Sequence, residues 1–148
     1  TMQVSDEMME ILKQTHKFTR LPWVAKTGLT YIGYGHIMTK TENYKKLPKK
    51  DCILLFEKDI KRINKQLNLI FKEEIPQNHF DVLASVIFDI GYELFKTSSL
   101  LTLYKKGLIE QASLRIMVWS KYKGVHTESL EYRRKIDFKI FTSNDYTI

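Results

Sequence analysis

The chain has 148 residues, one cysteine and a formal net charge of +7, with 43% hydrophobic and 28% charged residues. This length fits one domain around a single core, so we expect residues 1–148 to form a single domain. The lone Cys52 excludes an internal disulfide, and no apolar run approaches the roughly 20 residues that span a bilayer.

The positive charge is spread along the chain rather than gathered in one block. Such a charge favours polyanions, namely nucleic acid, anionic lipid head groups or the bacterial cell wall, and a surface tuned for solubility explains it equally well. Acidic residues interrupt the apolar residues of segment 2–12, which argues against a secretory signal peptide. The localisation stays open: synthesis in the cytoplasm followed by action in the envelope, periplasm or virion is compatible with the sequence.

The first third of the chain predicts a helix followed by a small sheet. Ser5 or the aspartate after it can cap a helix that should end near His16. β-branched and aromatic residues with glycines then predict a small β region over about 20–40, with a turn at Thr27-Gly28. A polar connector follows.

The rest of the chain predicts helices separated by short breaks. Pro48 suits the first turn of a long helix with an apolar stripe up to Ile70. Pro76 begins a second helix that should stop at Gly91 in a left-handed conformation. Further helices are expected over 98–106, 109–121 and about 128–141. The helical lobe therefore covers about 48–142, and the element order predicts an α+β protein.

Three motifs stand in a fixed order along the chain. They are Thr30-Tyr31-Ile32-Gly33-Tyr34-Gly35-His36, then Phe88-Asp89-Ile90-Gly91 with Phe95 and Ser98, then Trp119 with Arg133-Arg134-Lys135 and Phe141. Together they resemble the phage-type muramidases, the lysozymes of T-even and related phages (glycoside hydrolase family 24), from about residue 11 to residue 141. The resemblance implies a phage-lysozyme-like fold with an N-terminal helix, a shortened small β-sheet lobe, a long connecting helix and a C-terminal helical bundle.

The positions at which this family carries its catalytic residues are occupied differently here. By the family's spacing, the catalytic glutamate, aspartate and threonine fall on His16, Ala25 and Tyr31. Glycoside hydrolysis needs a protonated carboxyl that donates to the leaving oxygen and a second group that activates water or replaces it. Alanine can do neither. We therefore name no catalytic residue and interpret the chain as a catalytically degenerate member, a pseudoenzyme.

The resemblance gives His36 a structural role. In the family this histidine pairs with an aspartate on the long helix, and Asp59 falls at the matching place. A carboxylate beside a histidine favours the charged imidazolium, so the pKa of His36 should rise. We expect the pair to tie the β region to the helix.

The expected binding site is the cleft that corresponds to the substrate-binding cleft of the family. The cleft and ligand-binding candidates are Tyr34, Ile37, Phe88, Asp89, Gly91, Ser98 and Tyr132. Aromatic side chains in this region can stack on sugars, and they can equally fill and close the groove. The segment between Lys40 and Phe56 is shorter than in the family, so less of one cleft wall should remain.

Several functions stay open. The preferred one is non-catalytic binding of peptidoglycan or of an envelope or phage protein. The alternative is an active peptidoglycan muramidase with a site rebuilt from His16, Tyr31 and Asp89, with Glu93 nearby. A purely structural or regulatory lysozyme-like protein is the third.

Other classes find less support. The histidines and Cys52 are scattered without metal-ligand spacing, so we expect no metal and no cofactor. No recognition motif supports a specific nucleic-acid binder, and neither a serine nucleophile elbow nor a phosphate-binding loop is present. We expect a monomer without a transmembrane segment.

Overall fold

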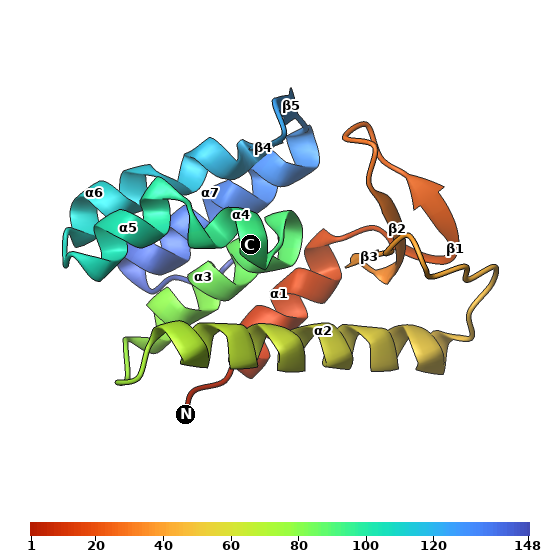
Figure 1. The fold of residues 1–148 in the computed structure, drawn as a ribbon, viewed down its shortest axis with the longest axis horizontal. Helices are drawn as coiled ribbons and strands as arrows, with labels where there is room; N and C mark the ends of the chain where they lie inside the picture. The colour runs from red at the N-terminus through yellow and green to blue at the C-terminus, as the bar shows by residue number, and fades with distance from the viewer.

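The computed structural model describes all residues from 1 to 148, and the chain begins with a helix followed by a small sheet (Figure 1). These first elements are α1 (Asp6–Thr15), β1 (Phe18–Val24), β2 (Thr30–Tyr34) and β3 (His36–Ile37). The Ser5 side chain caps α1 by accepting a hydrogen bond from the amide of Met8. The strands are antiparallel in the order β1-β2-β3, and the sheet begins slightly earlier than expected because Phe18 pairs with Tyr34.

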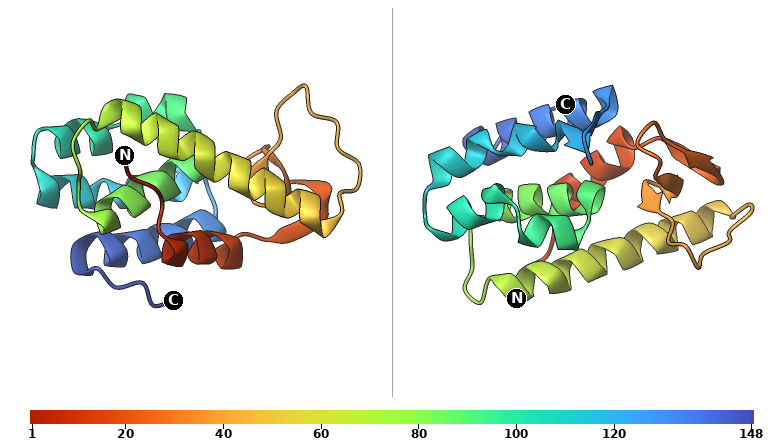
Figure 2. Two further views of the ribbon diagram at one scale, coloured as in Figure 1. Left: turned by 90° about the horizontal axis from the view of Figure 1, so that it is seen from below. Right: turned by 45° about the horizontal axis from the view of Figure 1, so that its top comes forward.

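Helix α2 (Lys49–Ile70) is the long connecting helix, and it begins directly after Pro48 as the sequence predicted. It runs along one edge of the molecule, under the sheet at one end and under the helical lobe at the other (Figures 1 and 2). One face of α2 is apolar and buried, with Phe56, Ile63 and Leu67 in the core. The opposite face of α2 is open to solvent.

The remaining elements form the helical lobe. They are α3 (Gln77–Ile90), α4 (Tyr92–Lys96), α5 (Ser99–Lys105), α6 (Ile109–Leu114), the 3-10 helix η1 (Ile116–Ser120), β4 (Lys121–Tyr122), β5 (Val125–His126) and α7 (Glu128–Ser143). Helix α3 is central, and every residue from Phe80 to Ile90 is buried. A helix that is covered on all sides needs a largely apolar sequence, which α3 has.

The structure departs from the predicted elements at three places. Helix α4 was not predicted, and Gly91 before it has φ 86° and ψ 157°, so it turns the chain in an extended rather than a left-handed helical conformation. The expected helix over 109–121 is broken into α6, η1 and β4.

Strands β4 and β5 form the third departure, a hairpin closed by Lys123 and Gly124, both with positive φ (47° and 83°). A two-residue turn with positive φ at both positions matches the twist of a hairpin, which explains why a helix cannot continue there. No helix of the protein combines the length and the apolar character required to cross a membrane.

Candidate functional site

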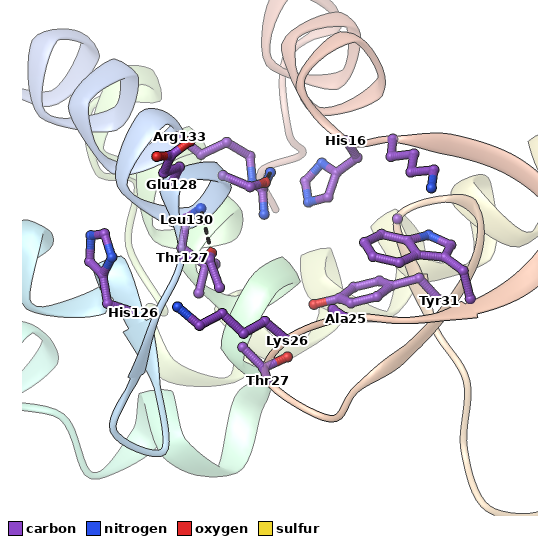
Figure 3. A pocket seen from close by; sticks show the side chains of 14 residues that line it. His16, Ala25, Lys26, Thr27, Tyr31, His126, Thr127, Glu128, Leu130 and Arg133 are labelled. Carbon is purple, nitrogen blue, oxygen red and sulfur yellow. Dashed lines mark hydrogen bonds between the residues drawn. The ribbon is translucent and has the colours of Figure 1, made fainter.

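A pocket of about 610 Å³ opens between the small sheet and the start of α7 (Figure 3). His16, Ala25 and Tyr31, which the sequence placed at the family's catalytic positions, all line it. The end of α1 supplies His16, the turn after β1 supplies Ala25, and β2 supplies Tyr31. The facing wall is built from the β4–β5 hairpin and the first residues of α7.

His16 ends α1 and uses both ring nitrogens inside the protein. Nδ1 lies 2.7 Å from the carbonyl oxygen of Leu12, and Nε2 lies 2.8 Å from Oδ1 of Asp89. The residue is only 6% exposed. Gly35 makes this position accessible to the ring, because a Cβ at residue 35 would lie 2.5 Å from Cδ2 of His16. Neither ring nitrogen is therefore free to reach a ligand in the pocket.

Asp89 requires a correction, because it was expected at the cleft edge. Its carboxylate is buried and does not line the pocket. Arg133 donates to both of its oxygens, from Nε to Oδ2 at 2.9 Å and from one terminal nitrogen to Oδ1 at 3.0 Å. Arg134 donates to Oδ2 at 2.8 Å. The motif of two arginines on α7 thus holds this carboxylate inside the protein, where it cannot serve as a relocated catalytic group.

The charges around His16 set its protonation. Burial and then the guanidinium of Arg133 lower the pKa of His16, and the charge of Asp89 offsets this only in part. Burial alone would raise the pKa of Asp89, but Arg133, His16 and Arg134 outweigh it and hold that pKa well below the usual range. A general acid must carry a proton near neutral pH. His16 is poorly suited to that role.

Tyr31 forms the aromatic floor of the pocket together with Trp23. The two rings are stacked with centroids 5.5 Å apart and planes inclined by 27°. Burial, followed by the charge of Asp89, raises the pKa of Tyr31 to about 12. The phenol is therefore neutral at physiological pH, and its hydroxyl points toward the facing wall (Figure 3). A neutral phenol is a weak nucleophile.

Glu128 is the one carboxylate that lines the pocket, and the sequence analysis did not single it out. It is exposed in the first turn of α7, after Thr127, whose Oγ1 caps the helix by accepting from the amide of Leu130 at 3.0 Å. Lys26 lines the pocket from the sheet side (Figure 3). The cap-like Thr-Glu-Ser sequence could have marked the helix start, but nothing local indicates that this start faces Tyr31.

The other expected cleft residues do not line the pocket. Phe88 and Ser98 are buried, Phe88 in the core and Ser98 as the cap of α5, where its Oγ accepts from the amide of Leu101. Tyr34 packs against Phe18 with ring centroids 4.6 Å apart. These residues support the fold rather than the cleft, because their helices and strands direct them toward the core.

The remaining candidates lie at other surfaces. Gly91 borders a separate depression together with Glu93 and Tyr122. Ile37 pairs with Tyr31 across the sheet, and Tyr132 is 49% exposed on α7 without lining the pocket. These residues therefore lie on several surfaces and do not line the pocket together.

His36 lies between two carboxylates. Its Nδ1 is 2.9 Å from Oδ2 of Asp59 on α2, and its Nε2 is 3.0 Å from Oε1 of Glu42 in the connector. Burial lowers the pKa of His36, but the hydrogen bonds and charges of Asp59 and Glu42 outweigh burial, so the pKa is raised. The structure thus brings together the pair expected from the resemblance and adds Glu42, which the sequence analysis missed. No cluster of three or more histidine, cysteine or acidic side chains is arranged to hold a metal ion.

Comparisons with known proteins agree with the fold. A protein-family model described as phage lysozyme matches residues 13–137. The chain is 28% identical over 125 residues to the endolysin of Acyrthosiphon pisum secondary endosymbiont phage 1, covering 82% of this chain and 83% of the relative. It is 28% identical over 120 residues to the SAR-endolysin of Enterobacteria phage P21, covering 81% of this chain and 73% of the relative.

Two solved structures share the fold over almost the whole chain. An endolysin from Escherichia coli O157:H7 phage FAHEc1 superposes with a TM-score of 0.80 at 21% identity, covering 99% of this chain and 98% of that one. The muramidase domain of SpmX from Asticaccaulis excentricus superposes with a TM-score of 0.79 at 24% identity, covering 97% and 99%. At these identities the likeness shows the fold alone.

Proposed function

Because this chain belongs to the phage lysozyme family, we propose that it binds peptidoglycan in the pocket without cleaving it. The α+β fold and the family predicted from the three sequence motifs are confirmed. The loss of catalysis and the role of the pocket as a glycan-binding site are our proposal.

The observation that carries the proposal is the arrangement of His16. Both of its ring nitrogens are occupied, by the Leu12 carbonyl and by Asp89, at the position where the family resemblance places the catalytic acid. Ala25 brings no functional group to the second position. The neutral phenol of Tyr31 fills the third. Hydrolysis needs an acid and a group that handles water, and this set supplies neither.

The rest of the pocket supports binding. The stacked Trp23 and Tyr31 rings form an aromatic wall of the pocket against which a sugar ring can pack. Nζ of Lys17, which also lines the pocket, lies over the Trp23 ring at 4.5 Å from its centroid. Lys26 and Glu128 supply polar groups on opposite walls. An aromatic wall with a few polar groups is typical of a small-ligand site.

The test incubates the purified protein with isolated peptidoglycan and measures two quantities. These are the soluble muropeptides released and the protein that sediments with the sacculi. We expect sedimentation without release. Trp23→Ala should reduce sedimentation, whereas Tyr132→Ala, an exposed aromatic residue outside the pocket, should not. Release that disappears in His16→Ala would overturn the proposal. Neither release nor sedimentation would favour a protein partner in the envelope or phage particle.

Active muramidase is the second candidate function, and Glu128 is the observation that favours it. This residue is the only carboxylate of the pocket lining and is exposed to a ligand. If muropeptides are released, Glu128→Gln distinguishes a rebuilt active site from a contaminating hydrolase. Release that persists unchanged in Glu128→Gln would exclude this residue as the acid.

A further inference from the structure

The outward face of α2 carries a cluster of exposed cations between two exposed leucines. These residues are Leu54, Lys58, Lys61, Arg62, Lys65 and Leu69. At 3.6 residues per turn they fall within an arc of roughly 100° on one side of the helix. Leu54 is 53% and Leu69 is 65% exposed. We call this set the α2 outer face.

The cations of the α2 outer face are largely free of partners. Arg62 donates to Asp59, whereas Lys58, Lys61 and Lys65 form no ion pair. An open groove of about 960 Å³ runs beside them, and no carboxylate lines it. Like charges at this spacing repel one another in solution. These unpaired cations do not stabilise the helix by themselves, and contact with an anionic surface would relieve their repulsion.

We propose that the α2 outer face docks on the surface of an anionic lipid bilayer. Lysine and arginine side chains are attracted to lipid phosphates, and leucines beside them can enter the boundary between head groups and acyl chains. Helix α2 has 22 residues, so at 1.5 Å per residue it presents a straight edge about 33 Å long. A straight edge of this kind can lie flat on a membrane.

The leucines decide between a bilayer and a soluble polyanion. A polyanion such as a phosphate polymer needs only the cations, and it gains nothing from large apolar side chains held in water at both ends of the cluster. A bilayer uses both. The pocket is lined by the small sheet and the start of α7. Figure 1 shows both of these elements on the same side of α2, so docking through the opposite, outer face leaves the pocket open.

The experiment measures co-sedimentation of the full chain with vesicles of phosphatidylcholine alone and of phosphatidylcholine with phosphatidylglycerol. We expect binding to the mixed vesicles only, with weaker binding as the salt concentration rises. The variant Lys58→Glu/Lys61→Glu/Lys65→Glu should weaken binding by on the order of 100-fold. The variant Leu54→Ser/Leu69→Ser, which keeps the charge, should weaken it by on the order of 10-fold.

The matched control is Lys105→Glu/Lys106→Glu/Lys123→Glu, which makes the same change in net charge at exposed lysines outside α2. It should weaken binding much less than the α2 variant. Equal loss in both triple variants would overturn the proposal in favour of net charge alone. Loss in the α2 lysine variant without any loss in the leucine variant would overturn the role of the leucines and leave only electrostatic attraction to the charged surface. Absence of binding to mixed vesicles at low salt would also overturn it.

Discussion

Nε2 of His16 lies 2.8 Å from Oδ1 of Asp89, although the two residues are 73 positions apart in the sequence. The contact joins the end of α1 to the end of α3 and continues through Arg133 and Arg134 into α7. His16, at the position where the family resemblance places the catalytic acid, is thus paired with a buried carboxylate. The consequences for stability and activity can be measured separately.

Asp89→Asn should destabilise the protein. The substitution removes the charge that faces the buried guanidinium groups of Arg133 and Arg134. Breaking a buried ion pair from one side typically costs about 3–5 kcal/mol, because the remaining charge stays unpaired. Urea unfolding at neutral pH gives the free energy of unfolding. Glu93→Gln, at a side chain that is 86% exposed, is the control and should change it by less than about 0.5 kcal/mol. An Asp89→Asn effect as small as that of the control would contradict the expectation that the ion pairs of Asp89 with Arg133 and Arg134 stabilise the protein.

Restoring the family's side chains should restore hydrolysis only when Asp89 is neutralised as well. The variant His16→Glu/Ala25→Asp/Tyr31→Thr places a new carboxylate where His16 now meets Asp89 at 2.8 Å. Two carboxylates at that distance repel each other, and the pKa of one is strongly raised. Adding Asp89→Asn removes the repulsion and frees Arg133 for the new glutamate.

We therefore expect muropeptide release from the fourfold variant to exceed that of the wild type by more than about 10-fold, a difference of about 1.4 kcal/mol in the activation barrier. The threefold variant should release less than the fourfold variant. Equal release from both would show that the charge of Asp89 does not influence the pocket.

Gly35→Ala should destabilise the protein more than Gly107→Ala. Both glycines have nearly the same positive φ, +79° and +78°, so an alanine meets a similarly unfavourable φ at both positions. A Cβ at Gly35 would lie 2.5 Å from Cδ2 of His16, whereas nothing lies within 4 Å of one at Gly107. Strain costs about 1–2 kcal/mol at either site, and overpacking at Gly35 adds about 1–3 kcal/mol. Thermal unfolding of the two variants measures the difference. Equal loss in both would mean that His16 moves freely.

Glu42→Gln should lower stability in mildly acidic solution and have little effect in alkaline solution. The pKa of His36 is raised in the folded protein. The charged His36 therefore contributes fully to stability below its unfolded pKa of about 6.5, and this contribution is lost as the pH rises through the folded pKa. Burial raises the pKa of Glu42, but the hydrogen bonds from the Thr39 amide and from His36 outweigh burial and lower it. The carboxylate is therefore ionised across the same range. The melting temperatures of wild type and variant should thus differ at pH 5.5 and converge at pH 9.

The control for this pH dependence is Glu57→Gln, an exposed carboxylate on α2. Its melting temperature should keep the same offset from the wild type at both pH values. A Glu42→Gln offset that is equal at both pH values would argue against a charged pair between His36 and Glu42.

Trp23 should report ligand binding in the pocket. The protein has only Trp23 and Trp119, so the emission of a Trp119→Phe variant comes from the pocket alone. Addition of soluble peptidoglycan fragments should change this emission. The variant Tyr31→Ala removes an aromatic contact with the ligand, and such a contact contributes about 1 kcal/mol. We therefore expect this variant to bind the fragments about fivefold more weakly. Unchanged emission at saturating fragment would place the ligand elsewhere.

The sequence by itself determined the family and most of the elements. Local signals explain this success: Ser5 caps α1, Pro48 precedes α2 and Gly28 turns the chain between β1 and β2. The same local signals failed between residues 109 and 126, where the apolar spacing suits a helix but Lys123 and Gly124 form a hairpin turn.

Only the tertiary structure decided what each polar side chain does. Asp89 follows a helical pattern that is equally compatible with a cleft edge and a buried ion pair, and its burial against Arg133 and Arg134 depends on how α3 and α7 pack. Glu128 meets the pocket because α7 begins opposite β2. Short-range spacing specifies helices and strands, whereas burial and charge pairing arise from contacts between distant segments, so these roles appear only when the chain is folded.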